Sequence, residues 1–337
     1  MPEPFVALPH AGRVPAAMRR ARPAPAARPR HPALDLLAEH LDDPDVTDLF
    51  INGGDGLFID RGHGAEPVTH WRASEADVRD LATALIGLGG RHLDDASPCV
   101  DVRLDGGIRV HAVLPPLARD GTMISVRVPR AHVRGLEGLQ QAGALDAATG
   151  DRLRELIRAR ENILITGAAG TGKTTLLAAL LSCVPARERI VTIEDVAELQ
   201  LDHPHHVALE ARQANLEGVG GIGLARLVRE ALRMRPDRIV VGECRGEEVR
   251  ELLSALNTGH DGGAGTVHAN GLDEVPARLE ALGALAGLGD RALARQVVSA
   301  IGWVVHLERD GTGRRRVSAA GRPVLRKGRL AMEARPW

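Results

Sequence analysis

The segment that most constrains this chain is residues 162–175, NILITGAAGTGKTT, an apolar stretch that runs into a glycine-rich turn and then into LLAALL. Strand, loop and helix are expected in that order. The pattern G-x-x-x-x-G-K-[ST] is complete at residues 167–174. Its glycines let backbone N–H groups close around an anion, and the following helix N-terminus adds partial positive charge. The segment predicts a nucleoside triphosphate site; a glycine-rich turn with an incidental lysine is the weaker alternative.

Two side chains of this loop have expected chemical roles. Lys173 is a mobile cation for the β- and γ-phosphates, and Thr174 supplies a hydroxyl ligand for Mg2+. A nucleoside triphosphate and Mg2+ are therefore the expected ligands of the loop. The residues expected to bind the nucleotide are Gly167, Ala168, Ala169, Gly170, Thr171, Gly172, Lys173, Thr174 and Thr175.

The length of 337 residues exceeds what one hydrophobic core usually organises, so more than one domain is expected. Residues 1–31 are rich in Pro, Ala and Arg, which predicts a disordered basic tail rather than a transit peptide. We expect a smaller α+β domain at 32–130, a linker suited to a hinge at 131–150, and the phosphate-loop domain at 151–337.

Apolar periodicity predicts the elements of the first domain. Leu36, Leu37 and Leu41 suit one face of a short helix, and residues 73–88 have the period of a longer helix. The NGGD sequence at 52–55 predicts a hairpin turn. The expected strands are 47–51, 56–59, 100–104, 108–113 and 123–128.

In the second domain, strand-like and helix-like segments alternate, which predicts an α/β fold with a mainly parallel sheet. The expected strands after the loop are 189–193, 207–211, 238–241, 264–267 and 303–307. The expected helices are 151–160, 224–234, 247–256, 273–285 and 292–301.

Three carboxylates, Glu194, Asp195 and Glu198, follow the expected strand at 189–193. Open α/β sheets bind ligands at the carboxyl ends of their strands, so this position favours a functional role over a solvated loop. Such carboxylates hold Mg2+ or orient the attacking water. Glu194 and Asp195 are candidate metal ligands, and Glu198 is a candidate catalytic residue.

Two more polar side chains end apolar strands. Glu243 follows RIVVG and can reach Mg2+ through water or polarise the nucleophile; a surface ion pair with Arg245 is the weaker alternative. His268 closes the glycine-rich segment that begins at Asn257. Although a lone histidine is usually a satisfied polar residue, His268 is expected to contact the γ-phosphate and pass its presence to the next subunit.

Composition narrows the range of partners. The formal net charge is −1, aromatic residues make up 2% and tyrosine is absent, so no nucleic acid is expected as a partner. The three cysteines form no C-x-x-C pair, which argues against a zinc cluster or a disulfide framework. No apolar run approaches the roughly 18 residues of a membrane span.

Taken together, four segments resemble the ATPases of the type II and type IV secretion superfamily, which are hexameric RecA-like motors. They are GAAGTGKTT at 167–175, IEDVAELQL at 193–201, RPDRIVVGECRG at 235–246 and NTGHDGGAGTVHAN at 257–270. AELQL, EARQANLEGVGGIG and DPDVTDLFING are most similar to the tight-adherence (Tad/Flp) pilus assembly ATPases. The four-cysteine zinc element of the type II branch is missing, which disfavours that branch.

The resemblance implies a RecA-like carboxyl-terminal domain, Mg2+-dependent ATP hydrolysis and a ring, expected to be a hexamer. It implies that Glu198 or Glu243 activates water, with Glu198 the first choice. It also implies that Arg109 and Arg127 of the first domain approach the γ-phosphate, since the second domain shows no obvious arginine for that task.

The setting implied by the resemblance is the cytoplasm, at the inner face of the cytoplasmic membrane, with inner-membrane platform proteins as partners. Tad/Flp-type pilus assembly or protein secretion is the leading interpretation, and a conjugative type IV secretion motor is the alternative. A DNA translocase or helicase is less favoured because of the charge and the scarcity of aromatics. A scaffold that binds the nucleotide without hydrolysing it is a further alternative. It would require that the carboxylates at the strand ends have no catalytic role.

Overall fold

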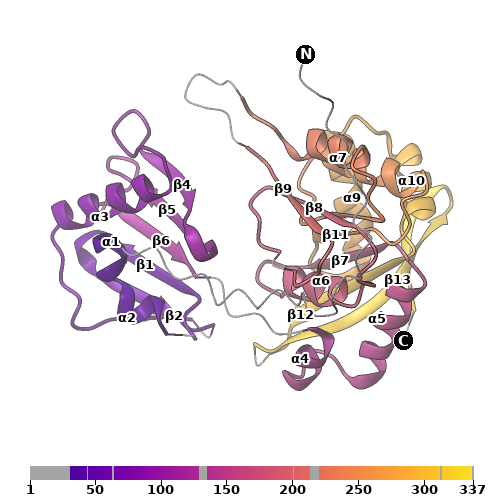
Figure 1. Ribbon diagram of the computed structural model, residues 1–337, viewed down its shortest axis with the longest axis horizontal. Helices are drawn as coiled ribbons and strands as arrows, with labels where there is room; N and C mark the ends of the chain where they lie inside the picture. The colour runs from indigo at the N-terminus through magenta and orange to yellow at the C-terminus, as the bar shows by residue number, and fades with distance from the viewer. Residues whose placement is uncertain are drawn as a thin grey trace, which may run out of the picture. The chain divides into compact units, whose positions relative to one another are not determined.

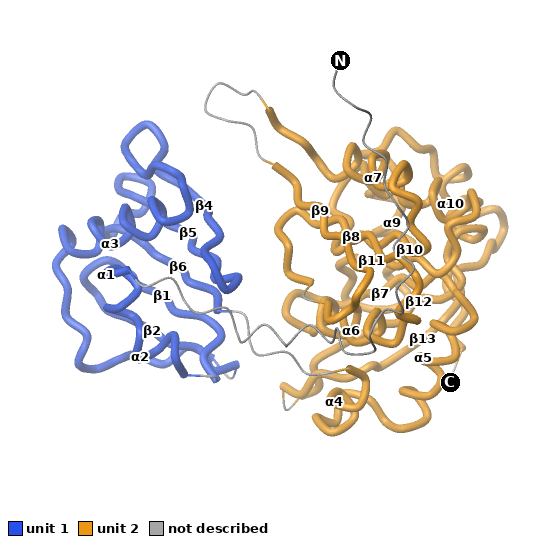
Figure 2. The backbone as a smooth tube through the Cα atoms, in the orientation of Figure 1, with its two compact units in different colours: residues 1–130 blue, residues 131–337 orange. Residues whose placement is uncertain are grey.

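The computed structural model describes residues 31–43, 45–62, 64–128, 135–199, 201–212, 220–311 and 313–335. The chain divides into two compact units after Arg130 (Figure 2), and each is described by itself. The tail predicted at 1–31 lies outside the described residues except for His31. Among the described helices, none has both the length and the apolar content needed to cross a bilayer.

The first unit contains a six-stranded antiparallel sheet in the order β3-β2-β1-β6-β5-β4 (Figure 1). Its strands are β1 (Asp48–Asn52), β2 (Leu57–Asp60), β3 (Ala65–Pro67), β4 (Cys99–Arg103), β5 (Arg109–Val113) and β6 (Met123–Arg127). All the expected strands are present, and the NGGD turn joins β1 to β2. The edge strand β3 carries no sequence signal, because its residues are all exposed.

Helix α3 (Glu75–Leu88) packs against the sheet of the first unit and buries its apolar face in the unit's core. The leucine-rich start of the unit forms two short helices, α1 (Pro32–Asp35) and α2 (Ala38–Leu41). Leu37 is fully buried, but Leu36 is 66% exposed. The expectation of a single helix with Leu36 on its apolar face is therefore wrong, since the segment forms two short helices with a break between α1 and α2.

The second unit is built on an eight-stranded sheet in the order β14-β13-β12-β7-β11-β10-β8-β9. Its strands are β7 (Ile163–Gly167), β8 (Ile190–Glu194), β9 (His206–Glu210), β10 (Arg238–Val241), β11 (Ala264–His268), β12 (Trp303–Arg309), β13 (Arg315–Arg326) and β14 (Arg329–Ala334). The strands from β12 to β9 are parallel, whereas β13 and β14 extend the sheet as an antiparallel ribbon. The predicted mainly parallel sheet is confirmed, and the ribbon is an addition to it.

Helices cover both faces of this sheet. They are α4 (Gly135–Gln141), α5 (Ala147–Arg158), α6 (Lys173–Leu181), α7 (Leu224–Leu232), α8 (Glu248–Leu256), α9 (Val275–Leu285) and α10 (Asp290–Ala300). One apolar cluster packs α7 to α10 against the sheet, and a second packs α4 to α6 against it. Because both faces are covered, β7, β8 and β10 consist entirely of buried residues.

Residues 135–150 are the described part of the linker expected at 131–150, and they belong to the second unit. Leu136 and Leu139 of α4, together with Leu145, are buried in the same apolar cluster as α5 and α6. Asp146 caps α5 by accepting a hydrogen bond from the backbone of Thr149 (2.7 Å). Residues 135–150 of the expected connector therefore form packed structure, and its residues 131–134 lie outside the described residues.

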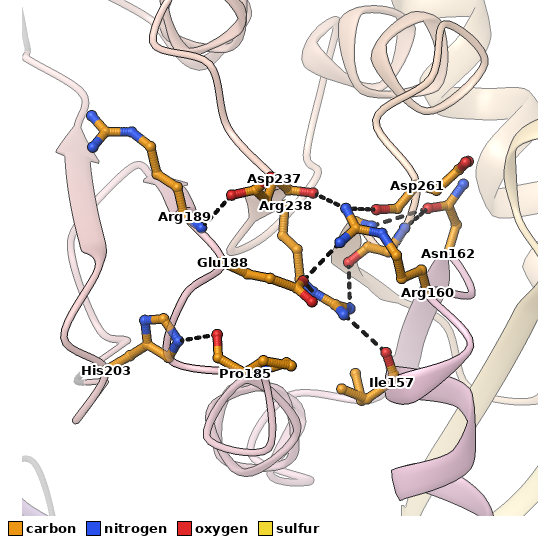
Figure 3. Close-up of polar contacts among 12 residues, drawn as sticks. Ile157, Arg160, Asn162, Pro185, Glu188, Arg189, His203, Asp237, Arg238 and Asp261 are labelled. Atoms are coloured by element: carbon orange, nitrogen blue, oxygen red, sulfur yellow. Dashed lines mark hydrogen bonds and ion pairs between the residues drawn. The ribbon is translucent and has the colours of Figure 1, made fainter.

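At the amino edge of the parallel sheet, a buried ion pair fixes the start of β10 (Figure 3). The Arg238 side chain is 1% exposed, and its Nε donates to Glu188 Oε2 at 2.7 Å. Its Nη1 and Nη2 donate to the carbonyl oxygens of Gly262 (3.2 Å) and Ile157 (2.9 Å). Arg160 donates to the same Glu188 oxygen at 2.9 Å. These contacts join the ends of three elements that are far apart in the sequence.

Removing the carboxylate of this pair is expected to destabilise the protein. In Glu188→Ala, Arg238 keeps two carbonyl acceptors but becomes a buried cation without its ion-pair partner, which we expect to cost about 3 kcal/mol of unfolding free energy. The matched control is Glu230→Ala, which removes the partner of exposed Arg233 and should cost less than about 1 kcal/mol. Urea unfolding followed by circular dichroism measures both. Equal effects of the two substitutions would contradict the prediction.

Candidate functional site

Strand ends of the second unit bring the predicted site segments to one edge of the sheet. Gly167, which ends β7, lies opposite His268, which ends β11. The next strand, β10, is followed by Gly242, whose N–H donates to the carbonyl of Ile193 on β8 (2.8 Å). The three polar segments predicted from sequence therefore meet at the carboxyl edge, the edge at which open α/β sheets bind ligands.

The phosphate-binding loop, residues 167–174, joins β7 to α6 as predicted. Gly167 has φ +154°, and a Cβ there would lie 2.5 Å from the carbonyl oxygen of Leu307. Gly172 has φ +96° and stands directly before the first turn of α6. Both positions therefore require glycine. Ala168, Ala169 and Gly170 are exposed, while Thr171 is buried and donates to the carbonyl of Ala168 (2.9 Å).

The side chain of Lys173 folds back over the loop and is largely buried. Its Nζ donates to the carbonyl oxygens of Gly167 (3.0 Å) and Ala168 (2.9 Å) and lies 3.2 Å from Nδ1 of His268. Burial lowers the pKa of Lys173, while the negative charge of Glu243 opposes this shift. The ammonium group thus lies at the loop, where a phosphate would compete with the two carbonyls for it.

His268 connects Lys173 to Glu243. Its Nε2 lies 2.5 Å from Oε1 of Glu243, while its Nδ1 faces the Lys173 ammonium. Since an ammonium group only donates, these contacts fit the tautomer with the proton on Nε2. Burial and the nearby charge of Lys173 lower the pKa of His268, so the neutral ring is favoured. His268 therefore lies beside the loop lysine, and its expected contact with the γ-phosphate stays a prediction.

Glu243 also forms the ion pair that the sequence treats as the weaker alternative. Its Oε2 lies 2.6 Å from Nη2 of Arg245. The Arg245 guanidinium is also 3.9 Å from Asp195. Oε2 of Glu243 is therefore paired with the Arg245 cation, while Oε1 is buried and lies 2.5 Å from Nε2 of His268.

Glu198 and Thr174 place two oxygen atoms close together beside the loop. Thr174 Oγ1 donates to Glu198 Oε2 at 3.5 Å. Hydroxyl and carboxylate oxygens are ligands that suit Mg2+, which takes its remaining ligands from water and phosphate. In the described part of the chain, no group of three or more His, Cys, Asp or Glu side chains is arranged to hold a metal alone. The pair fits Mg2+ that arrives with the nucleotide.

Glu194, a candidate metal ligand from sequence, is used differently. It is 4% exposed, and its Oε1 accepts hydrogen bonds from the backbone N–H groups of Glu198 (2.9 Å) and Leu199 (3.0 Å). A Cβ on Gly242 would lie 2.6 Å from the Glu194 side chain, so that glycine admits the carboxylate. The metal role expected for Glu194 disagrees with these contacts, because this carboxylate shapes the turn that carries Glu198. Asp195 remains exposed beside Arg245.

The arginines predicted in the first unit lie side by side on its sheet. Arg109 of β5 is directly opposite Arg127 of β6, and Arg103 of β4 is directly opposite Arg109. Arg127 Nε donates to Asp48 on β1 at 3.1 Å. The sequence does not single out Arg103, because strand register decides its position. Directly opposed residues share one face of a sheet, so the three arginines lie in one row.

Two arginines of the second unit also lie at the phosphate-binding loop. Arg245 contacts Glu243, and Arg309 donates from Nη2 (3.0 Å) and Nε (3.3 Å) to the carbonyl of Gly170. The expectation that the second domain shows no obvious arginine to neutralise the transferred phosphoryl group stays a prediction, since these contacts are with Glu243 and the Gly170 carbonyl. Arg245 could be found from its place two residues after Glu243. Arg309 carries no such signal, because its proximity depends on β12 lying beside β7.

Comparisons with known proteins identify relatives across most of the chain. The family described as "Type II/IV secretion system protein" matches residues 34–318. The Mycobacterium tuberculosis (strain H37Rv) protein Rv3659c, whose name proposes a role in conjugal transfer, is 51% identical over 279 residues, covering 81% of this chain and 79% of that protein. The type IV secretion system protein VirB11 of Brucella suis is 31% identical over 315 residues, covering 83% and 87%.

A solved structure supports the fold. The pilus retraction motor PilT with bound ADP aligns over 84% of this chain and 81% of its own, with a TM-score of 0.59 and 21% identity. At that identity the likeness concerns the fold alone. The family match covers far more than half of the residues, and the relatives agree with it. The chain therefore belongs to the type II/IV secretion system protein family.

Proposed function

We propose that this protein is a Mg2+-dependent ATPase that works as a ring, expected to be a hexamer, to drive a secretion-type machine at the cytoplasmic face of the membrane. One observation carries the proposal: a complete phosphate-binding loop lies at the same sheet edge as Glu198, Glu243 and His268. A scaffold without hydrolysis would not need several titratable groups converging on one loop.

In the proposed reaction, the loop N–H groups and Lys173 bind the β- and γ-phosphates. Thr174 would hold Mg2+, which would neutralise developing charge on the phosphates. Glu194 positions Glu198 by fixing the turn between them. Glu198 is our first choice to orient the attacking water, because it is exposed beside Thr174. Glu243 is the second choice.

The ring is proposed because Arg109 and Arg127 belong to the first unit. We propose that they reach the γ-phosphate of a neighbouring subunit and neutralise the charge of the transferred phosphoryl group. Their position in one row with Arg103 supports an anion-binding role. Inner-membrane platform proteins are the proposed partners of the ring.

The relatives favour one of the two biological settings. The two relatives compared by sequence are named as a putative conjugal transfer protein and as a type IV secretion system protein. We therefore favour a conjugative or type IV secretion motor over Tad/Flp pilus assembly, whose particular closeness the comparisons do not show. Adjacent relaxase and coupling-protein genes would support this choice, whereas adjacent pilin and prepilin peptidase genes would oppose it.

Phosphate release from ATP tests the activity directly. We expect turnover with Mg2+, loss of turnover with excess EDTA, and recovery when Mg2+ is restored. DNA and RNA should leave the rate unchanged at every salt concentration. Turnover that persists in EDTA would contradict the metal role, and strong stimulation by DNA would favour a translocase instead.

Glutamine substitutions separate the two candidate glutamates. Glu198→Gln keeps shape and hydrogen bonding but loses the charge that orients water, so turnover should fall by about a hundredfold while ATP still binds. Glu243→Gln should have a smaller effect on turnover. The control is Glu230→Gln, an exposed glutamate outside the site. A nearly active Glu198→Gln would reverse the ranking, and loss of ATP binding would make Glu198 chiefly a metal-holding group.

A further inference from the structure

Arg245 has a fixed backbone and a movable side chain. The backbone N–H groups of Arg245 and Gly246 donate to Oε1 of Glu248, a carboxylate that is 5% exposed. In contrast, the Arg245 side chain is 59% exposed and leaves this anchored turn to reach Glu243 and Asp195. Such a residue can exchange one ionic partner for another without moving the main chain.

The guanidinium of Arg245 lies within electrostatic reach of the phosphate-binding loop. Its Nη2 lies 2.6 Å from Oε2 of Glu243, whose other carboxylate oxygen lies 2.5 Å from Nε2 of His268. Nδ1 of His268 in turn lies 3.2 Å from the Lys173 ammonium at the loop. Two side chains therefore connect Arg245 to the lysine that would receive the terminal phosphate.

An exposed ion pair such as Arg245–Glu243 is weak, because water screens it. A terminal phosphate carries more negative charge than a carboxylate and accepts two parallel hydrogen bonds from a guanidinium. We propose that Arg245 is a γ-phosphate sensor that leaves Glu243 for the γ-phosphate when ATP binds. The inference rests on the proposed function, because it assumes that ATP occupies the loop.

The exchange has a chemical consequence for Glu243. In the pair described here, Oε1 of Glu243 faces His268 and Oε2 faces Arg245. Transfer of Arg245 to the γ-phosphate leaves Oε2 available to accept a hydrogen bond from water. ADP has no γ-phosphate and does not draw Arg245 away. Glu243 is thus freed only by a nucleotide that carries a γ-phosphate.

Binding measurements test the sensor without relying on turnover. Dissociation constants for ADP and for the non-hydrolysable analogue adenylyl-imidodiphosphate are measured by calorimetry with Mg2+. In Arg245→Gln, the analogue should bind about ten- to a hundredfold more weakly, as for the loss of a hydrogen bond between charged groups, while ADP affinity stays unchanged. Arg233→Gln is the control, since it removes an exposed arginine of α7's end that pairs with Glu230.

A second variant tests the competition itself. Glu243→Gln removes the charge that competes for Arg245, so the analogue should bind more tightly than to the unaltered protein. This gain should disappear when Arg245→Gln is combined with it. If Arg245→Gln weakens ADP and the analogue equally, or weakens neither, the sensor is wrong although the ATPase proposal stands. If the unaltered protein binds neither nucleotide, the proposed function itself fails.

Discussion

Lys173→Ala is expected to lower the rate of ATP hydrolysis on the order of 10³-fold while the protein stays folded. The substitution removes the ammonium group that lies over the loop carbonyls of Gly167 and Ala168. The backbone N–H groups of the loop remain, so the fold and part of the phosphate cradle persist. Phosphate release measures the effect, and circular dichroism checks the fold.

The chain offers a matched control for this substitution, because its one other lysine is Lys327. Lys327 lies in the exposed turn between β13 and β14, within the described residues and outside the site. Lys327→Ala should hydrolyse ATP at the rate of the unaltered protein. Near-normal hydrolysis by Lys173→Ala would refute the assignment of the site.

Arg109→Ala or Arg127→Ala is expected to reduce hydrolysis by roughly 10³- to 10⁵-fold, the range of arginine fingers in other systems. If these arginines act on a neighbouring subunit, mixing either variant with Lys173→Ala should restore activity. In the mixture, some boundaries join an intact loop to an intact arginine. Specific activity of the unaltered protein should also rise with concentration as rings form.

Arg79→Ala provides the control for this experiment, since it removes an exposed arginine of the first unit that pairs with Asp95. Arg79→Ala should hydrolyse ATP alone, so its activity should not depend on mixing with Lys173→Ala. Activity that is independent of concentration down to demonstrably monomeric protein, with neither Arg109 nor Arg127 required, would refute the ring mechanism.

Much of the second unit could be predicted because its signals are local. The spacing of Gly167, Gly172 and Lys173 determines the loop, since positive φ angles and a helix N-terminus impose those residue types. The parallel sheet follows from apolar strands that alternate with helices. The position of Glu243 and His268 at strand ends likewise follows from the pattern of polar residues after apolar runs.

Features that depend on tertiary contacts could not be predicted in the same way. Glu194 and Glu198 look equivalent in sequence, but only the fold shows that Glu194 is buried against Gly242 and holds backbone N–H groups. Arg309 reaches Gly170 only because β12 lies beside β7. Leu136 and Leu139 precede the phosphate-loop strand and resemble linker residues until the apolar cluster that surrounds them is known.

The buried ion pair at the amino edge has a consequence for how the unit can move. Strand β10 is only four residues long, and Arg238 at its start is held by Glu188 and two carbonyls. Its inner amides are buried and paired to strands on both sides, so they can exchange with solvent only when the whole unit unfolds. We expect the exposed tip of the phosphate-binding loop to open far more easily. In a catalytic cycle the loops after the strands would then move, while β10 would stay a fixed reference from which Glu243 is presented.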